Sequence, residues 1–158
     1  MIREAECFEQ QEDNNVKCFL CPRRCLIKPE NTGFCRVREN RNGKLYTLTY
    51  GGTSTQTVDP VEKSLFRFYP GTQTLSLSTL GYTFTCPWCQ NYNISQSRVG
   101  SLVTFETKPE EVVGMAKKYG VQSVTYTYNE PIIWYEFIKN TAKLNKIENA
   151  KNILVTNG

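Results

Sequence analysis

The chain has 158 residues, 39% apolar and 22% charged, and its 19 basic and 15 acidic side chains give a formal net charge of +4. This balance is typical of one soluble globular domain and does not argue for nucleic-acid binding, and its apolar runs fall short of the about 18 residues of a membrane span. Seven cysteines and no histidine exclude histidine-dependent catalysis and imidazole metal sites. Because no signal-peptide pattern opens the chain, we expect a cytoplasmic protein with reduced thiols.

Closely spaced cysteines dominate the N-terminal part. Residues 1–15 are expected to be a polar tail in which Cys7 has no role, and residues 16–70 a cysteine-rich module. The four cysteines of this module occur as C-F-L-C-P-R-R-C and T-G-F-C and are Cys18, Cys21, Cys25 and Cys35. Their spacing favours metal ligation over disulfides. A structural zinc site and an auxiliary iron–sulfur cluster both suit four cysteines, and unligated reduced thiols are the remaining interpretation.

The rest of the module is expected to contain a β-hairpin and then loops. Asn42-Gly43, flanked by alternating apolar and polar residues, is a strong hairpin signal. Residues 51–70 contain Gly51-Gly52, Asp59-Pro60 and Tyr69-Pro70-Gly71, which predict turns and a domain boundary near residue 70.

Residues 71–158 alternate between strand and helix patterns. In chain order the expected segments are a strand at 74–80, a helix after a capping box at 107–110, a strand at 123–128, a helix opened by Pro131 and a strand at 153–156. This β-α-β-α-β order predicts a parallel sheet in an α/β domain. Ligands of such sheets bind at the carboxyl ends of the strands.

The loop that follows the first of these strands contains the remaining two cysteines. Residues 81–91 read G-Y-T-F-T-C-P-W-C-Q-N, and this segment resembles the cluster loop of radical S-adenosylmethionine (radical SAM) enzymes, which is C-x3-C-x2-C with an aromatic residue before the last cysteine. Cys86, Trp88 and Cys89 match the pattern, and Tyr82 stands where the first cysteine belongs. The resemblance implies that Cys86 and Cys89 ligate a 4Fe-4S cluster and that Trp88 packs beside it.

In that family three cysteine thiolates hold three irons, and the fourth iron chelates S-adenosylmethionine. An electron from the reduced cluster then cleaves the sulfonium C–S bond and gives a 5′-deoxyadenosyl radical, so the cofactors carry the difficult chemistry. The resemblance further implies an electron donor such as flavodoxin or ferredoxin. It identifies no catalytic side chain in this chain.

Two further strand ends carry the same resemblance. Residues 125–131, T-Y-T-Y-N-E-P, resemble the position that holds the amino group of S-adenosylmethionine, and residues 155–158, V-T-N-G, resemble the end of the third strand near its ribose. Asn129, Glu130 and Asn157 are therefore expected to line the cofactor site. Glu130 has an alternative interpretation as the first-turn acid of the helix that Pro131 opens.

Upstream, C-F-L-C-P-R-R-C, T-G-F-C-R-V-R-E-N, V-D-P-V-E-K and F-Y-P-G resemble the branch of pyruvate formate-lyase-activating-enzyme-like proteins that belongs to the AmmeMemoRadiSam system. The fold that this implies is the first half of a partial (β/α)6 radical SAM barrel, residues 71–158, behind the cysteine-rich module.

Two departures from the family shape the expected activity. The phenol of Tyr82 is a hard oxygen donor, whereas iron–sulfur clusters prefer thiolates. The sequence also stops at Gly158, before the later strands of the family, so we expect a truncated chain whose radical chemistry is impaired. The alternatives are a non-catalytic metal-binding or interaction module, or one half of a split radical SAM enzyme whose barrel a second polypeptide completes.

Overall fold

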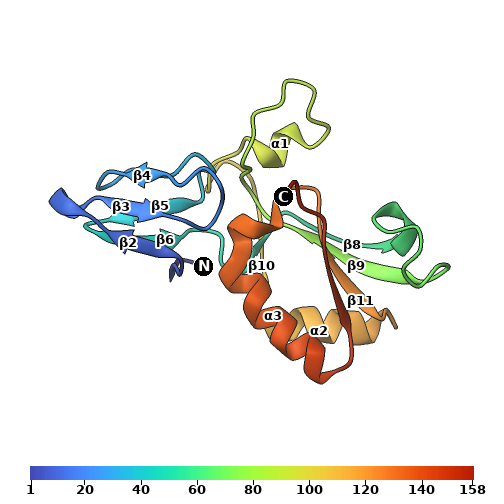
Figure 1. Ribbon diagram of the computed structural model, residues 1–158. Helices are drawn as coiled ribbons and strands as arrows, with labels where there is room; N and C mark the ends of the chain where they lie inside the picture. The colour runs from blue at the N-terminus through green and yellow to red at the C-terminus, as the bar shows by residue number, and fades with distance from the viewer.

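Three parallel strands form the centre of the molecule, as the alternating pattern predicts. The computed structural model describes residues 1–158 as a mixed α/β protein with four sheets (Figure 1). In the largest sheet, β11 (Ser123–Tyr126) lies between β9 (Gln73–Ser78) and β12 (Lys151–Leu154) and is parallel to both. The carboxyl ends of the three strands therefore lie at one edge.

A fourth strand of this sheet was not expected. β8 (Thr55–Pro60) pairs antiparallel with the whole length of β9, so residues 51–70 are not mainly loop and the sheet begins before the expected boundary near residue 70. The β-branched residues at alternate positions suit a strand, and Pro60 is tolerated because β8 is an edge strand. The resulting sheet, in the order β12-β11-β9-β8, is open, and no barrel is formed.

The predicted helices pack together against this sheet. α2 (Pro109–Lys118) begins where the Lys108 N–H donates to Glu111 Oε2 across 2.7 Å, one residue later than the predicted capping box. The second helix begins at Pro131 with a 3-10 turn, η3 (Pro131–Trp134), and continues as α3 (Tyr135–Ile147). The main core lies between helices and sheet and includes Leu75, Leu77, Val112, Val124, Tyr126, Trp134 and Phe137. Each such apolar side chain contributes about 1.5–3 kcal/mol by burial.

Residues 1–50 form a separate β layer, seen at the left of Figure 1. One sheet contains β2 (Phe8–Gln10), β3 (Val16–Cys18) and β4 (Leu26–Ile27); the other contains β1 (Arg3–Glu4), β6 (Lys44–Thr47) and β5 (Arg38–Arg41). The hairpin between β5 and β6 is confirmed, and its two turn residues, Asn42 and Gly43, have φ of 49° and 86° as such a turn requires.

The expected polar tail is wrong, because residues 1–15 supply strands to both N-terminal sheets. β1 pairs with β6 and β2 pairs with β3, while Ala5 is buried. Residues 1–15 have the composition of a polar tail because β1 and β2 are short edge strands with mostly exposed side chains. Backbone pairing holds them in the sheets, and this pairing needs no apolar side chain. A 3-10 turn, η1 (Glu12–Asn14), connects β2 to β3.

The remaining elements are short. β7 (Gly52–Thr53) pairs with β10 (Phe105–Glu106), η2 (Val61–Lys63) follows β8, and α1 (Tyr92–Ser95) follows the cysteine loop after β9. None of the helices has both the length and the apolar character needed to cross a bilayer.

A buried ion pair joins the N-terminal layer to the helices. Arg38 Nη2 on β5 lies 2.5 Å from Glu136 Oε2 on α3, and the second carboxylate oxygen accepts from the Glu6 N–H across 2.8 Å. Trp134 Nε1 also donates to the carbonyl oxygen of Thr49 across 2.7 Å. The two parts of the chain are therefore connected by specific polar contacts as well as by packing.

Candidate functional site

An open, polar cavity of about 370 Å³ lies at the carboxyl ends of the parallel strands. It collects side chains from the loop after β9, the ends of β11 and β12, and η2. Its lining includes Lys63, Tyr82, Gln90, Asn91, Thr127, Tyr128, Asn129, Thr156 and Asn157. The position is the one at which α/β sheets bind ligands, and three sequence-predicted residues, Tyr82, Asn129 and Asn157, are brought together there.

Asn129 fixes the chain where it leaves β9. Its Oδ1 accepts from the Thr79 N–H across 3.3 Å, and its Nδ2 donates to the carbonyl oxygen of Gly81 across 3.2 Å. Gly81 has φ of 86°, a conformation that disfavours any residue with a Cβ. Asn129 therefore sets the direction of the loop that carries Tyr82 and the cysteines.

The loop after β9 does not gather its three expected positions into one group. The Cys89 N–H donates to the carbonyl oxygen of Cys86 across 3.2 Å in a tight turn, and both thiols are half-buried. Tyr82 lines the polar cavity, but neither cysteine does. Trp88 is 84% exposed and does not pack on the loop core. The loop therefore offers two soft sulfur donors, and the third position of the pattern offers a phenol, a hard donor that iron–sulfur clusters do not prefer.

Glu130 is buried, and its carboxylate faces protein donors. Oε1 accepts from the Ile132 N–H across 3.0 Å and from Thr156 Oγ1 across 2.7 Å, while Oε2 accepts from the Asn157 N–H across 2.9 Å. Glu130 is therefore the N-cap of the 3-10 turn that Pro131 opens, which agrees with its alternative interpretation as an acidic residue at the start of that helix. In this arrangement Glu130 holds the end of β12 against the end of β11 and does not line the cavity.

Asn157 connects that strand end to the loop after β9. Its Nδ2 donates to Thr83 Oγ1 across 2.9 Å. Because Glu130 holds the Asn157 backbone, the ends of β11 and β12 and the start of the cysteine loop form one hydrogen-bonded unit.

A lysine and a tyrosine at one wall of the cavity, and an aspartate bonded to both, were not singled out from the sequence. Tyr128 donates to Asp59 Oδ2 across 2.5 Å, and Lys63 Nζ donates to the Tyr128 hydroxyl across 2.8 Å and to Asp59 Oδ1 across 3.0 Å. Lys63 is the only charged side chain that lines the cavity. The four-residue spacing of Asp59 and Lys63 in V-D-P-V-E-K is a sequence signal for this pair, but nothing local indicates Tyr128.

The contacts among Asp59, Lys63 and Tyr128 shift the pKa of each of the three side chains. Burial acts to raise the pKa of Asp59, but hydrogen bonds from Tyr128, Ser76 and Lys63 outweigh it and hold that pKa below its usual value. The hydrogen bond to Tyr128 raises the pKa of Lys63, and burial and then Asp59 raise the pKa of Tyr128. At neutral pH the wall is therefore a carboxylate, a neutral phenol and an ammonium group. Tyr128 also has φ of 68°, a strained conformation for a non-glycine residue.

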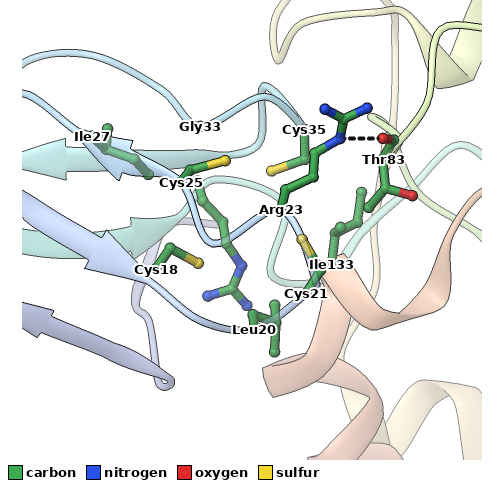
Figure 2. A pocket seen from close by; sticks show the side chains of 11 residues that line it. Cys18, Leu20, Cys21, Arg23, Cys25, Ile27, Gly33, Cys35, Thr83 and Ile133 are labelled. Carbon is green, nitrogen blue, oxygen red and sulfur yellow. Dashed lines mark hydrogen bonds between the residues drawn. The ribbon is translucent and has the colours of Figure 1, made fainter. Parts of the chain in front are cut away.

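The four N-terminal cysteines line a second, small cavity, and Figure 2 shows their sulfur atoms around it. Cys18 ends β3, Cys21 and Cys25 lie in the loop before β4, and Cys35 lies just before β5. The Cys18 N–H donates to the carbonyl oxygen of Cys25 across 2.9 Å, which fixes two of the four relative to each other. As the side chains stand, no three of them form a coordinating group.

Arg23 connects this cysteine loop to the loop after β9. Its Nε donates to the carbonyl oxygen of Thr83 across 2.5 Å (Figure 2). Its guanidinium lies 3.5 Å from the ring centroid of Phe34. Since the Thr83 hydroxyl also accepts from Asn157, Arg23 and Asn157 hold the same residue, one by its carbonyl oxygen and the other by its side chain. The two cysteine-containing loops are therefore structurally coupled.

Comparison with known proteins gives one relative without a described activity. The chain is 43% identical over 158 residues to a protein named uncharacterized protein MJ0808 from Methanocaldococcus jannaschii, a match that covers 99% of this chain and 47% of that protein. The chain thus spans about half the length of this curated relative. No protein-family model matches the chain, and no solved structure matches it.

Proposed function

We propose that this chain carries an iron–sulfur and S-adenosylmethionine site of the radical SAM type at the carboxyl ends of β9, β11 and β12, in an arrangement equivalent to the first half of a (β/α)6 barrel. The observation that supports it best is the shared cavity: Tyr82, Asn129 and Asn157 come from three separate strand ends, and all three line it. The cavity is open and polar, so a polar ligand can reach all three side chains.

Cys86 and Cys89 would hold the cluster, and the position of Tyr82 would be filled weakly. A bound cluster would supply one electron to S-adenosylmethionine, delivered to the cluster by a flavodoxin or ferredoxin. The protein's own part is to bind and orient. Lys63, held by Asp59 and Tyr128, presents an ammonium group to the cavity, which suits the carboxylate of an amino-acid ligand such as S-adenosylmethionine.

The test of this proposal replaces the one position at which the loop departs from the family. Tyr82→Cys supplies the third thiolate, so we expect anaerobic reconstitution to give about four iron and four sulfide ions per chain and a visible absorption that dithionite bleaches. The wild-type chain should retain a smaller amount. Tyr119→Cys is the matched control, because Tyr119 is 52% exposed at the end of α2 and adds a thiol that is remote in sequence from Cys86 and Cys89. Equal iron content in all three proteins would overturn the proposal.

A second candidate function is that of one half of a split radical SAM enzyme, or a metal-binding interaction module. The observation that favours it is the edge of the sheet: β12 pairs only with β11, and Leu154 and Val155 are exposed there, 52% and 39%. An unpaired edge strand with apolar side chains suits the addition of a strand from another polypeptide. A co-purified polypeptide whose binding protects residues 151–155 from amide exchange would support this function, and unchanged exchange would contradict it.

A further inference from the structure

The cavity between the four N-terminal cysteines has the size and donor chemistry of a site for one metal ion. Its volume is about 20 Å³, which accommodates one water-sized sphere. Apart from the four thiols its walls are largely apolar, with Leu20, Ile27 and Ile133 among them. Thiolates are soft ligands that select zinc or iron–sulfur clusters, and a cavity for one sphere suits a single ion better than a four-iron cluster.

The loops around the cavity supply hydrogen-bond donors to the sulfur atoms. The backbone N–H groups of Leu20 and Val37, each two residues after a cysteine, favour the charged form of the Cys18 and Cys35 thiols. Donors placed in this way stabilise a charged thiolate.

Arg38 provides a second, independent observation. Its side chain is 1% exposed and lines the same cavity. Two of its nitrogens are used, Nη2 by Glu136 and Nη1 by the carbonyl oxygen of Glu6, but Nε is buried without any hydrogen-bond partner. A buried N–H group without an acceptor costs about 1–3 kcal/mol, so such groups are rare unless a ligand satisfies them. A thiolate sulfur in this cavity would be that acceptor.

We propose that Cys18, Cys21, Cys25 and Cys35 bind one tetrahedrally coordinated Zn²⁺ ion, and that Arg38 Nε donates a hydrogen bond to one of the coordinating thiolates. Each thiol releases its proton when it coordinates, and the sulfur atoms draw inward to about 2.3 Å from the ion. Arg38 is then a positioning residue that uses one nitrogen for the metal site and another for Glu136. The ion thereby stabilises the junction between the N-terminal layer and α3.

The test measures zinc binding by the whole chain. We expect one Zn²⁺ per chain, measured by competition with a chromogenic chelator, and a Co²⁺-substituted protein with the intense sulfur-to-metal charge-transfer absorption of tetrahedral thiolate coordination. Cys25→Ser should lower zinc affinity at least 100-fold. Cys7→Ser is the matched control, because Cys7 lies outside the cavity, and it should leave affinity unchanged.

The role of Arg38 needs its own comparison. Arg38→Lys keeps a positive charge near Glu136 but removes Nε, so we expect zinc affinity to fall about 10- to 100-fold and the Co²⁺ charge-transfer band to shift. Glu136→Gln disturbs the same ion pair and keeps Nε, so it serves as the control for a merely structural effect. If both variants changed affinity equally and neither moved the band, the role of Arg38 would be overturned. Should Arg38→Lys not fold, the ¹⁵N–¹H signal of Arg38 Nε in the wild-type chain decides the question: it should shift and exchange more slowly with water when zinc is added, and an unchanged signal would overturn the role of Arg38.

This inference does not depend on the proposed radical SAM site. A double variant, Cys86→Ser with Cys89→Ser, should still bind one zinc ion while losing the reconstituted iron. Four iron and four sulfide ions retained by that double variant would overturn a single-ion site at the N-terminal cysteines. Absence of zinc from both wild type and this variant would overturn it as well, whatever the iron content of the loop after β9.

Discussion

Arg38 on β5 and Glu136 on α3 form an ion pair in which both side chains are almost completely buried, 1% and 2% exposed. Removal of one partner leaves an uncompensated charge in the interior. We therefore expect Glu136→Ala to lower the free energy of unfolding by about 3–5 kcal/mol, measured by urea denaturation. The control is Glu148→Ala, because Glu148 pairs with Lys117 at the surface and should cost no more than about 1 kcal/mol. Similar losses in the two variants would contradict the prediction.

Gly81 is the position at which the chain turns from β9 into the cysteine loop. Its φ is 86°, and a Cβ there would overlap the carbonyl oxygen of Cys35 and lie 2.8 Å from Val37 Cγ1. Gly81→Ala should therefore cost about 3 kcal/mol or more, from backbone strain and overlap together. Gly71→Ala is the control, since Gly71 has φ of 79° with nothing within 4 Å and should show only the strain of about 1–2 kcal/mol. Thermal unfolding of both variants checks the difference.

The parts of the fold that the sequence predicts correctly depend on local signals. Asn42-Gly43 specifies a hairpin turn by itself, and the strands at β9, β11 and β12 show in short β-rich segments separated by helix patterns. β1 and β8 were missed for different reasons. β1 has two residues and depends on β6, more than 40 positions away, while β8 lies among the turn-forming residues of 51–70.

The candidate site likewise contains residues that the sequence predicts and residues that it does not. Tyr82, Asn129 and Asn157 were expected to lie together because their segments resemble radical SAM motifs, and each of them follows a strand of the parallel sheet, which brings its carboxyl ends to one edge. Glu130 faces inward because three donors surround its carboxylate, which depends on where β12 ends relative to β11. The contact of Tyr128 with Asp59 spans 69 positions and follows from the pairing of β8 with β9, the strand that the sequence did not show.

The carboxylate of Glu130 should control the order of the chain after β12. It accepts three hydrogen bonds, two of them from Thr156 and Asn157, and bonds to a charged group contribute about 1.5–3 kcal/mol each. We expect Glu130→Gln, which removes the charge at nearly constant shape, to raise the amide exchange rate of Asn157 about tenfold or more. Glu110→Gln, at an exposed position on α2, should leave that rate unchanged. Equal exchange in Glu130→Gln and wild type would show that the carboxylate does not hold this segment.

Tyr128 should control the acid sensitivity that Asp59 introduces. Because the pKa of Asp59 is lower in the folded chain than its usual value near 4, Asp59 stabilises the fold above that pH, and this contribution is lost as the pH falls through the folded value. Tyr128→Phe removes one donor to the carboxylate, so the pKa of Asp59 should rise toward its usual value and about 1 kcal/mol of stability at neutral pH should be lost. A ¹³C NMR titration of the carboxyl carbon measures the first effect and urea unfolding at pH 7 the second. Tyr119→Phe, at an exposed tyrosine without a bond to Asp59, is the control. A titration of Asp59 that is the same in both variants would mean that Lys63 and Ser76 hold the carboxylate without the phenol.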